Sequence, residues 1–323
     1  MIKQIVDEII KKIKEYDTII IHRHIRPDGD AIGTSLGLRN VLRESFPEKK
    51  VYCAGGELPD YLKFLDDEDK VEDEEYNGAL AIVVDTAVSD RVYDNRFLKA
   101  KEIIKIDHHI PIENYGVINY VLEEYGSCSQ IVVEMCQEYP EIFKVNKEAA
   151  KYLFFAMITD TGRFKFTADG PAFRAAAFLL DVGIDVDMLY ANLYTKDKDI
   201  YKLTGWVYNN FETTENGVAY IKITQEIKKE YNVSSDDASN TINLLDSIKG
   251  SMIWILFNEQ DKEIRVRLRS RFIAVDKLGN KYNGGGHANA AGATVYSFDE
   301  ADQLLKDADL LLKEFKENNK DKF

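Results

Sequence analysis

Cysteine, proline and tryptophan are scarce in this chain of 323 residues, which contains 3, 6 and 2 of them. The cysteines, Cys53, Cys128 and Cys136, are too few and too scattered for a disulfide framework or a four-cysteine zinc site, and we expect them to be buried as small apolar side chains. The low proline count and a hydrophobic content of 45% are typical of a packed globular protein, and the length allows two domains.

Long apolar runs are lacking as well. The best run, residues 153–158, is far shorter than the roughly 18 to 20 apolar residues of a membrane span. Residues 1–17 mix charged and apolar residues at helical spacing, without the uninterrupted apolar core of a signal peptide. We therefore expect a cytoplasmic protein that does not associate with membranes.

Positive charge is in deficit, because 42 Lys and Arg stand against 56 Asp and Glu and give a net charge of -14. Binding to long nucleic acid depends on many Lys and Arg side chains that neutralise phosphates, so this balance argues against it. A small phosphate ligand would have to be held locally, by metal ions or by a tight cluster of arginines.

Four short apolar runs are separated by segments with helical spacing; they cover residues 18–24, 51–55, 79–86 and 102–109. Continuous apolar strands that alternate with helices indicate an α/β fold with a parallel sheet and helices on both faces. Ligands of such sheets bind at the carboxyl ends of the strands, where three of the four runs carry polar residues. We expect these polar residues to converge in space.

The rest of the chain has a different pattern. Residues 127–213 are mostly helical, and after the turn at Asn216-Gly217 strands and helices follow, ending in an amphipathic helix. We predict a larger α/β domain, a helical linker and a smaller α/β domain with a mixed sheet, at residues 1–195, 196–215 and 216–323.

Histidine is also rare, and its placement is informative. The five histidines lie at strand ends or in a glycine-rich loop, beside acidic or other polar residues: His22, His24, His108, His109 and His287. A single histidine of this kind is more often structural than functional, but the five together favour a functional site.

The segment "HIRPDGD" follows the first strand and places Asp28 and Asp30 after a histidine. We expect Pro27 to hold Arg26 in an extended conformation, and Gly29 to allow an unusual backbone dihedral, so that both carboxylates face one centre. The structural alternative is a polar turn with an Asp cap on the helix that follows.

Two further carboxylates end apolar segments: Asp85 follows a strand, and Asp160 ends a helix. Each alone is a weak signal, because a single Asp at the end of an element is common. Together with the imidazoles and carboxylates above, they form a donor set suited to manganese and, less ideally, to magnesium. Two such cations that share a carboxylate could activate water for attack at phosphorus.

Three successive glycines, Gly284 to Gly286, precede His287 in the last part of the chain. Their backbone N–H groups can approach an anion closely, and the imidazole can add a donor. A glycine run alone would be weak evidence for a binding site.

Just before the glycines, Arg265, Arg267, Arg269 and Arg271 alternate with other residues and should share one face of a strand. An ordinary solvated strand face is the alternative, but such a face normally mixes charges of both signs. We interpret the arginines as a phosphate-binding strip, since arginine binds phosphate in a bidentate manner.

The motifs "HIRPDGD", "VVDTA", "IDHH", "ITDTGRF" and "GGGHANAAGA" occur in this order along nearly the whole chain. In this combination the chain resembles the DHH family of phosphoesterases, named for the triplet that stands here at Asp107, His108 and His109. Within that family it is most similar to the bacterial nano-RNase and pAp-phosphatase type. The resemblance implies a DHH catalytic domain linked to a smaller DHH-associated domain that binds substrate.

The resemblance implies two groups of ligands, each for one divalent cation, with manganese preferred and magnesium or cobalt as alternatives. The first group is His24, Asp28 and Asp85, and the second is Asp30, Asp85, His108 and Asp160. Asp85 would bridge the two cations. His109 would contact the phosphate or donate a proton, and Asp107 would orient its neighbours.

The resemblance further implies that the second domain binds the terminal phosphate or sugar of the substrate. The candidates are Arg265, Arg267, Arg269, Gly284, Gly285, Gly286 and His287. Arg91 and Arg163 stand beside metal-motif residues and are weaker candidates, for which an ordinary salt bridge is as good an explanation. His22 matches no role in the family, and we expect it to be a hydrogen-bonded strand residue.

We therefore expect a manganese-dependent enzyme that hydrolyses very short RNA (about 2–5 nucleotides) to mononucleotides, and 3'-phosphoadenosine 5'-phosphate (pAp) to AMP. The alternatives within the superfamily are a cyclic- or linear-dinucleotide phosphodiesterase and a single-strand exonuclease. An inorganic pyrophosphatase lacks the GGGH loop, and a non-catalytic nucleotide sensor would usually have lost carboxylates. The resemblance also suggests a homodimer.

Overall fold

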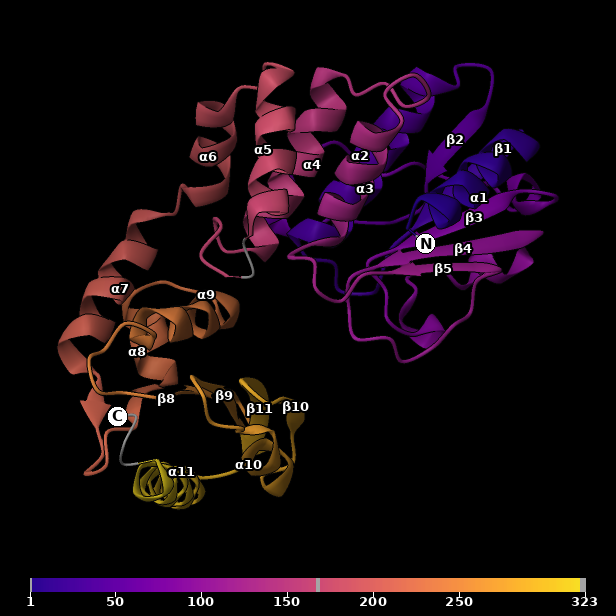
Figure 1. The fold of residues 1–323 in the computed structure, drawn as a ribbon. Helices are drawn as coiled ribbons and strands as arrows, with labels where there is room; N and C mark the ends of the chain where they lie inside the picture. Colours follow the sequence, from indigo (N-terminus) through magenta and orange to yellow (C-terminus); the bar gives the residue numbers. More distant parts are fainter. Residues whose placement is uncertain (1, 167–168, 320–323) are drawn as a thin grey trace. The chain divides into compact units, whose positions relative to one another are not determined.

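A computed structural model of the chain describes residues 2–166 and 169–319. It divides between Thr195 and Lys196 into two compact units, each with its own sheet (Figure 1).

The first unit contains a five-stranded parallel sheet in the order β2-β1-β3-β4-β5. Its strands are β1 (Thr18–His22), β2 (Lys50–Cys53), β3 (Leu80–Val84), β4 (Glu102–Asp107) and β5 (Ile118–Val121). The first four coincide with the four apolar runs, so the prediction of a parallel α/β sheet is confirmed. The sequence pattern misses β5, a short edge strand in which only Tyr120 is fully buried.

Six α-helices of the first unit lie in the described part of the chain: α1 (Ile2–Glu15), α2 (Gly29–Ser45), α3 (Cys128–Glu138), α4 (Lys147–Asp160), α5 (Gly170–Asp181) and α6 (Val186–Tyr194). Short 3-10 helices interrupt the loops at η1 (Asp60–Leu62), η2 (Asp73–Tyr76), η3 (Ser89–Arg91) and η4 (Asn95–Lys99). Helices α2, α3 and α4 pack on one another (Figure 1).

The two faces of this sheet are covered differently. On one face, Ile19 and Ile21 of β1 belong to a large core with apolar residues of α1 to α4. On the other face, Ile20 packs with Val71 and Tyr76, and Val83 packs with Phe97. Within the part of the chain that the structure describes, the helices on the second face are the 3-10 helices η2 and η4.

The second unit contains a six-stranded sheet in the order β10-β11-β9-β8-β7-β6. The strands are β6 (Glu212–Thr213), β7 (Ala219–Ile223), β8 (Ile253–Glu259), β9 (Ile264–Ser270), β10 (Gly285–His287) and β11 (Ala290–Val295). Only β7 and β8 pair in parallel and the other neighbours are antiparallel, which confirms the predicted mixed sheet.

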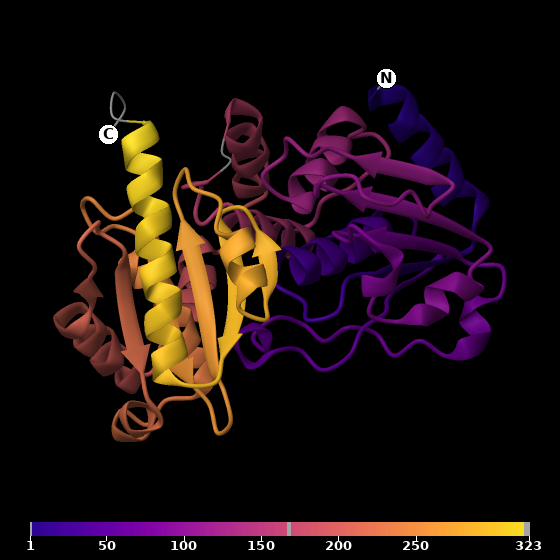
Figure 2. The same ribbon diagram turned by 90° about the horizontal axis from the view of Figure 1, so that it is seen from below.

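Helices cover both faces of the second sheet. They are α7 (Lys198–Asn210), α8 (Gln225–Glu230), α9 (Ser235–Asn240), η5 (Thr241–Leu245), α10 (Asp276–Lys281) and α11 (Phe298–Asn318). The long helix α11 lies along the sheet in Figure 2. Its buried leucines share a core with apolar residues of β8, β9 and β11.

Residues 196–215, predicted as a helical linker, form α7 and β6. Leu203 and Val207 of α7 are fully buried in a core with Ile221 of β7 and Leu256 of β8. The helix is therefore an integral part of the second unit and not a free connector.

The cysteines are free and buried, as expected for small apolar side chains. No helix in the described ranges 2–166 and 169–319 combines the length and the apolar composition needed to cross a membrane.

Candidate metal centre

The candidate site lies at the carboxyl ends of the adjacent strands β1, β3 and β4. His24 follows β1, Asp85 follows β3, and His108 follows β4. Because the three strands are parallel neighbours, their carboxyl ends meet at one edge of the sheet. Residues that are far apart in the sequence are thus brought together by the topology.

Helices α2 and α4 bring the remaining carboxylates to the same edge. Asp28 caps α2 by accepting a hydrogen bond from the N–H of Ala31, and Asp30 lies in the first turn of that helix. Asp160 is the last residue of α4. The two helices approach closely, because a Cβ on Gly33 of α2 would lie 2.6 Å from the carbonyl oxygen of Tyr152.

The conformation of the "HIRPDGD" loop differs from the prediction. Arg26 has a φ of 52°, so it is left-handed and not extended before Pro27. Gly29 is not among the residues with positive φ; a Cβ there would lie 2.3 Å from the Oγ1 of Thr159. Glycine is needed at this position because α4 approaches, and not because of an unusual dihedral.

Two groups of donor atoms converge around Asp85. The Nε2 of His24 lies 3.4 Å from Oδ2 of Asp85 and 3.8 Å from Oδ1 of Asp28. The Nε2 of His108 lies 3.4 Å from Oδ1 of Asp85, 3.6 Å from Oδ2 of Asp30 and 3.3 Å from Oδ2 of Asp160. Each oxygen of Asp85 therefore faces a different group.

The donor atoms of these groups are close enough to bind a cation. Within the sets His24-Asp28-Asp85 and Asp30-His108-Asp160, one donor atom from each residue lies within 4.8 Å of the others. A third set, Asp85-His108-His109, meets the same limit and makes His109 an alternative ligand. The structure thus brings together all six predicted ligand residues.

Both candidate ligand histidines are oriented by backbone carbonyls. The Nδ1 of His24 lies 2.7 Å from the carbonyl oxygen of Ile25, and the Nδ1 of His108 lies 3.1 Å from that of Tyr125. With a hydrogen on Nδ1, Nε2 is the nitrogen that faces the carboxylates, and it would be the ligand atom once it is deprotonated. Such support is usual for histidines that bind metals.

Asp30 is fixed by three donors. Its carboxylate accepts hydrogen bonds from the backbone N–H groups of Cys128 at 2.6 Å and Ser129 at 3.2 Å, at the start of α3. The hydroxyl of Thr34 donates a third at 2.8 Å. These three residues, which sequence reasoning missed, hold the buried carboxylate in place.

The crowded carboxylates shift the protonation of the cluster. Burial, with the negative charges of Asp85 and Asp160, raises the pKa of Asp30 well above its ordinary value. Burial also raises the pKa of Asp160 to about 6. Burial lowers the pKa of His108, but the surrounding carboxylates outweigh this effect and raise the pKa to about 10. The carboxylates thus give the site an excess of negative charge, which bound cations would offset.

Asp85 itself supports a cation site in two ways. Its Oδ1 is buried and makes no hydrogen bond in the described part of the chain, although a buried carboxylate oxygen normally has a partner. Its φ is 51°, a left-handed conformation that a non-glycine residue adopts at a cost and that is common at functional sites. The mixed oxygen and nitrogen donors fit divalent cations such as manganese.

The remaining residues of the triplet are held differently. Asp107 is fully buried, and its Oδ1 accepts hydrogen bonds from the backbone N–H groups of His108 and His109. The Nδ1 of His109 also lies 2.8 Å from this oxygen. His109 is partly exposed, and within the described residues its hydrogen bonds involve Nδ1 and the backbone N–H but not Nε2.

Within the described residues, the contacts that the structure shows for Arg91 and Arg163 are not the salt bridges expected as the alternative. Arg91 contributes its carbonyl oxygen, which accepts a hydrogen bond from the N–H of Ile25 beside His24. The guanidinium of Arg163 lies 4.7 Å from the ring centre of Tyr194 in α6. Arg163 thus stacks on an aromatic ring.

His22 was expected to be hydrogen-bonded, and this is wrong. Its side chain is buried, and neither ring nitrogen has a partner in the described residues. The ring packs near those of Tyr76 and Phe97, at 5.8 and 6.0 Å between centres. Burial lowers the pKa of His22 to about 4, so the ring is neutral at pH 7.

The arginine strip lies on β9 in the second unit, where Arg265, Arg267 and Arg269 alternate with buried Val266 and Leu268. Arg271 lies beyond the end of β9, and its guanidinium is 5.7 Å from the ring centre of Trp254. The strip on the strand thus has three arginines and not four.

A hollow of about 410 Å³ adjoins part of the strip. It is lined by residues of α9, β9 and the glycine run, including Asp236, Ser239, Arg265, Arg267, Gly284 and Gly285. Gly292 of β11 pairs with Arg267 of β9 on one side and with Gly285 of β10 on the other. Arg269 is not among the lining residues.

The glycines also serve packing. A Cβ on Gly284 would lie 2.0 Å from the carbonyl oxygen of Gly292, and its N–H donates to Gly279, so it is not free for an anion. Gly286 has a φ of 143°. The side chain of His287 lies outside the part of the structure that is described.

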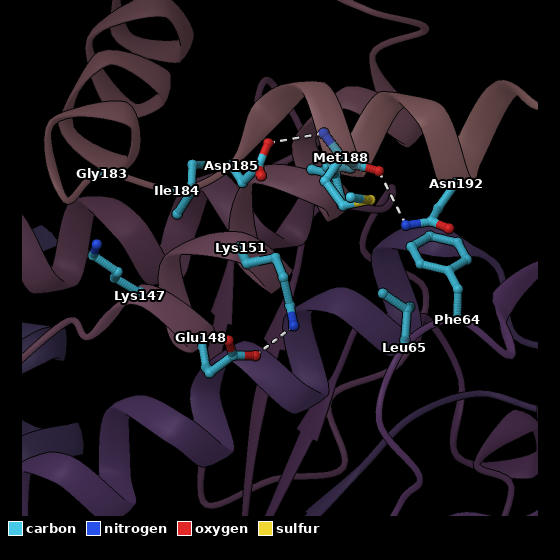
Figure 3. Close-up of a pocket in the computed structure, with 11 residues that line it drawn as sticks. Phe64, Leu65, Lys147, Glu148, Lys151, Gly183, Ile184, Asp185, Met188 and Asn192 are labelled. Carbon is cyan, nitrogen blue, oxygen red and sulfur yellow. Dashed lines mark hydrogen bonds and ion pairs between the residues drawn. The ribbon is translucent and has the colours of Figure 1, made fainter.

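A separate cavity of about 340 Å³, drawn in Figure 3, lies beside the start of α4, whereas Asp160 ends that helix. Lys147, Glu148 and Lys151 of α4 line it together with Met188 and Asn192 of α6. None of the predicted site residues contributes to it, so it is distinct from the carboxylate cluster.

Comparison with known proteins gives a consistent result for both units. Residues 18–157 match the N-terminal domain of the DHH family, and residues 215–314 match the DHHA1 domain. The chain is 38% identical over 309 residues to the bifunctional oligoribonuclease and PAP phosphatase NrnA of Bacillus subtilis, covering 95% of this chain and 98% of that protein. The protein of the same description from Mycoplasma genitalium is 31% identical, with 95% and 98% covered.

Two further similarities are informative. A crystal structure of an exopolyphosphatase-related protein from Bacteroides fragilis superposes with a TM-score of 0.85 at 27% identity, covering 96% of this chain and 98% of that one. The cyclic-di-AMP phosphodiesterase PdeA of Listeria monocytogenes is 25% identical over 316 residues, but only 46% of its length is covered.

Proposed function

Because the chain belongs to the DHH family and is a phosphoesterase, we propose that it hydrolyses very short RNA to mononucleotides and pAp to AMP, with two divalent cations. The observation that carries this proposal is the arrangement around Asp85, whose two oxygens face two separate donor groups. Relatives named as oligoribonucleases and PAP phosphatases at 31 to 38% identity support the substrate class.

We assign the two cations to the two donor groups described above, with manganese preferred and magnesium or cobalt as alternatives. His24, Asp28 and Asp85 would hold one, and Asp30, Asp85, His108 and Asp160 the other. Cations there would neutralise the negative charge of the phosphate and make water more acidic. Since the ligands already lie close together, little rearrangement is required of the protein.

We assign His109 to the substrate phosphate and not to a cation. The hydrogen bond from its Nδ1 to Asp107 raises the pKa of His109 and favours the charged ring, so Nε2 also carries a hydrogen that it can donate to a phosphate oxygen. In the reaction the oxygen of water bonds to phosphorus, the bond from phosphorus to the leaving oxygen breaks, and the leaving oxygen takes up a proton. A donor at Nε2 would stabilise the charge that develops on the phosphate.

We assign the terminal phosphate or sugar of the substrate to the hollow in the second unit. Arg265 and Arg267 supply positive charge there, and Gly285 lets the backbone come close to a ligand. In a chain with a net charge of -14, such local positive charge would select small phosphate ligands over long strands. Arg269 and His287 remain candidates for the same role.

A substrate panel tests the proposal. Turnover of a diribonucleotide, a pentamer, a 24-mer, pAp, a cyclic dinucleotide and pyrophosphate would be measured with manganese, with magnesium and with a chelator. We expect the dinucleotide and pAp to be hydrolysed fastest, and all activity to be lost on chelation. Faster turnover of the 24-mer would contradict the short-substrate proposal, and hydrolysis unaffected by chelation would contradict the role of the cations.

A pair of variants adds a site-specific control. Asp85→Asn should abolish turnover of every substrate, because it changes the residue shared by both donor groups. Asp90→Asn, in the exposed 3-10 helix η3 that follows, should retain it. Equal activities of the two variants would contradict the assignment of Asp85.

A cyclic-dinucleotide phosphodiesterase is the second candidate function, and the similarity to PdeA favours it only weakly because half of that protein has no counterpart here. Preferential hydrolysis of the cyclic substrate in the same panel would select it.

We further propose that the enzyme is cytoplasmic, does not bind membranes and forms a homodimer; analytical ultracentrifugation tests the last point.

A further inference from the structure

Lys105 is a lysine with no exposed surface in the middle of β4, two residues before Asp107. Residues two apart in a strand point to the same face of the sheet. The Nζ of Lys105 lies 3.2 Å from Oδ2 of Asp107, and both side chains are fully buried. Lysine is almost never fully buried without a partner, so its presence here requires an explanation.

The two oxygens of Asp107 have separate partners. Oδ1 accepts hydrogen bonds from the backbone N–H of His108 at 2.9 Å and of His109 at 3.2 Å, and lies 2.8 Å from Nδ1 of His109. Oδ2 is buried and makes no hydrogen bond in the described residues, so the ammonium of Lys105 is the charged group that faces it. Without Lys105 this side of the carboxylate would be buried and unpaired.

Lys105 also joins two loops of the candidate site. Its Nζ donates to the carbonyl oxygen of Ala87, two residues after Asp85, at 2.8 Å. It donates at 3.1 Å to the carbonyl oxygen of Glu113, in the loop that follows His109. The lysine therefore contacts the segment after Asp85, the DHH triplet and the loop beyond it.

We infer that Lys105 is a positioning residue that acts through Asp107 and thereby holds the ring of His109 with Nε2 directed to the substrate phosphate. The chain of contacts is Lys105 Nζ to Asp107 Oδ2, and Asp107 Oδ1 to His109 Nδ1. This inference rests on the proposed function, because it requires His109 to act on a phosphate. Neither Lys105 nor Asp107 need touch the substrate.

A double-mutant cycle tests the inference with the full-length protein, manganese and a diribonucleotide. Lys105→Met keeps an unbranched side chain, one atom shorter, and removes its charge. We expect kcat to fall about 10- to 100-fold with KM changed by less than about 3-fold and with two manganese ions per chain retained. In the background of Asp107→Asn, the same change should alter kcat by less than about 3-fold, because the group through which Lys105 acts is already changed.

Lys12→Met is the matched control. Lys12 pairs with Glu102, at the start of the same strand β4, with a distance of 2.8 Å between Nζ and Oε2. Among the described residues its ion pairs are with Glu15 and Glu102 and not with a site residue, so its variant should turn over like the wild type. If Lys105→Met does not fold, the Asp107→Asn variant can still be compared with the double variant. Neither of these two variants contains a charged Asp107 without the lysine that faces it.

The outcomes separate the inference from the function on which it rests. If the wild type hydrolyses neither the dinucleotide nor pAp, the proposed function fails. If the wild type is active but Lys105→Met keeps kcat within about 3-fold, only the role of Lys105 fails. A loss of about 10-fold or more on adding Lys105→Met to Asp107→Asn would show that Lys105 acts independently of Asp107, and would also overturn the inference.

Discussion

The carboxylate of Asp30 accepts a hydrogen bond from the backbone N–H of Cys128 at 2.6 Å, although the two residues are 98 positions apart. Asp30 lies in the first turn of α2, and Cys128 is the first residue of α3. The start of a helix has unpaired N–H groups and a positive dipole end, which favour a carboxylate. One candidate ligand is thus fixed by a helix that supplies no ligand itself.

The support of Asp30 by Thr34 leads to the first prediction. Thr34→Val removes the hydroxyl that donates to Asp30 but keeps the shape of a buried side chain. Since partners of metal ligands are worth about 10- to 100-fold in metal affinity, we expect manganese binding, measured by titration calorimetry, to weaken by that factor. Ser35→Ala is the control, because this neighbouring buried hydroxyl donates to the carbonyl oxygen of Ala31. Equal affinities of the two variants would contradict the role of Thr34.

The second prediction separates the two histidines of the triplet. The Nε2 of His108 faces Asp30, Asp85 and Asp160, whereas the Nδ1 of His109 is engaged by Asp107. His108→Ala should therefore lose one manganese per chain, and His109→Ala should keep both and lose kcat by about 100-fold or more. Metal content would be measured by mass spectrometry of the purified variants. Equal metal content would favour the alternative set in which His109 is itself a ligand.

The convergence of the candidate ligands could be predicted from the sequence because it follows from strand order. His24, Asp85 and His108 each follow an apolar run, and a parallel sheet places such positions at one edge. The alternation of Arg265 and Arg267 with buried residues likewise follows from the two-residue repeat of a strand. Local sequence patterns were sufficient to predict where a side chain lies when the contacts that place it are within one element or between neighbouring parallel strands.

What the sequence pattern missed depends on contacts between distant segments. Gly29 is required by the approach of Thr159, and Lys105 is buried because Asp107 and two loop carbonyls surround it. Arg26 is left-handed in spite of the proline that follows, and β5 is too short and too exposed to show as an apolar run. None of these features has a signature in the neighbouring residues, so only the folded chain reveals them.

The third prediction concerns pH. Burial raises the pKa of Asp160 to about 6, above the value of about 3.9 for an aspartate in an unfolded chain. Between these values the folded protein binds a proton that the unfolded chain does not, so this group stabilises the metal-free protein as pH falls through 6. The contribution of Asp160 to the free energy of unfolding is complete below about pH 4 and is lost as the pH rises through 6.

Thermal unfolding with a chelator present would measure this effect. The quantity of interest is the Tm of the wild type minus the Tm of Asp160→Asn. This difference should be a few degrees larger at pH 4.5 than at pH 7, because the variant lacks the titrating carboxyl. Taking the difference removes the contributions of groups that titrate alike in both proteins. A difference that stays constant, or falls on acidification, would contradict the raised pKa of Asp160.

The fourth prediction concerns substrate binding in the second unit. Arg267 is half-buried and lines the hollow beside Gly285, and Arg265 there is already paired with Glu263 at 3.1 Å. Arg267→Ala should raise KM for a diribonucleotide about 10- to 100-fold and change kcat by less than about 3-fold, since it removes a contact to a part of the substrate that does not react.

Arg267→Lys should recover only part of the loss, because lysine cannot bind phosphate in a bidentate manner. Lys222→Ala, on β7 and paired with Asp302, is the charge-matched control and should leave KM unchanged. A fall in kcat at constant KM for Arg267→Ala would place this arginine at the reacting phosphate instead of the substrate end.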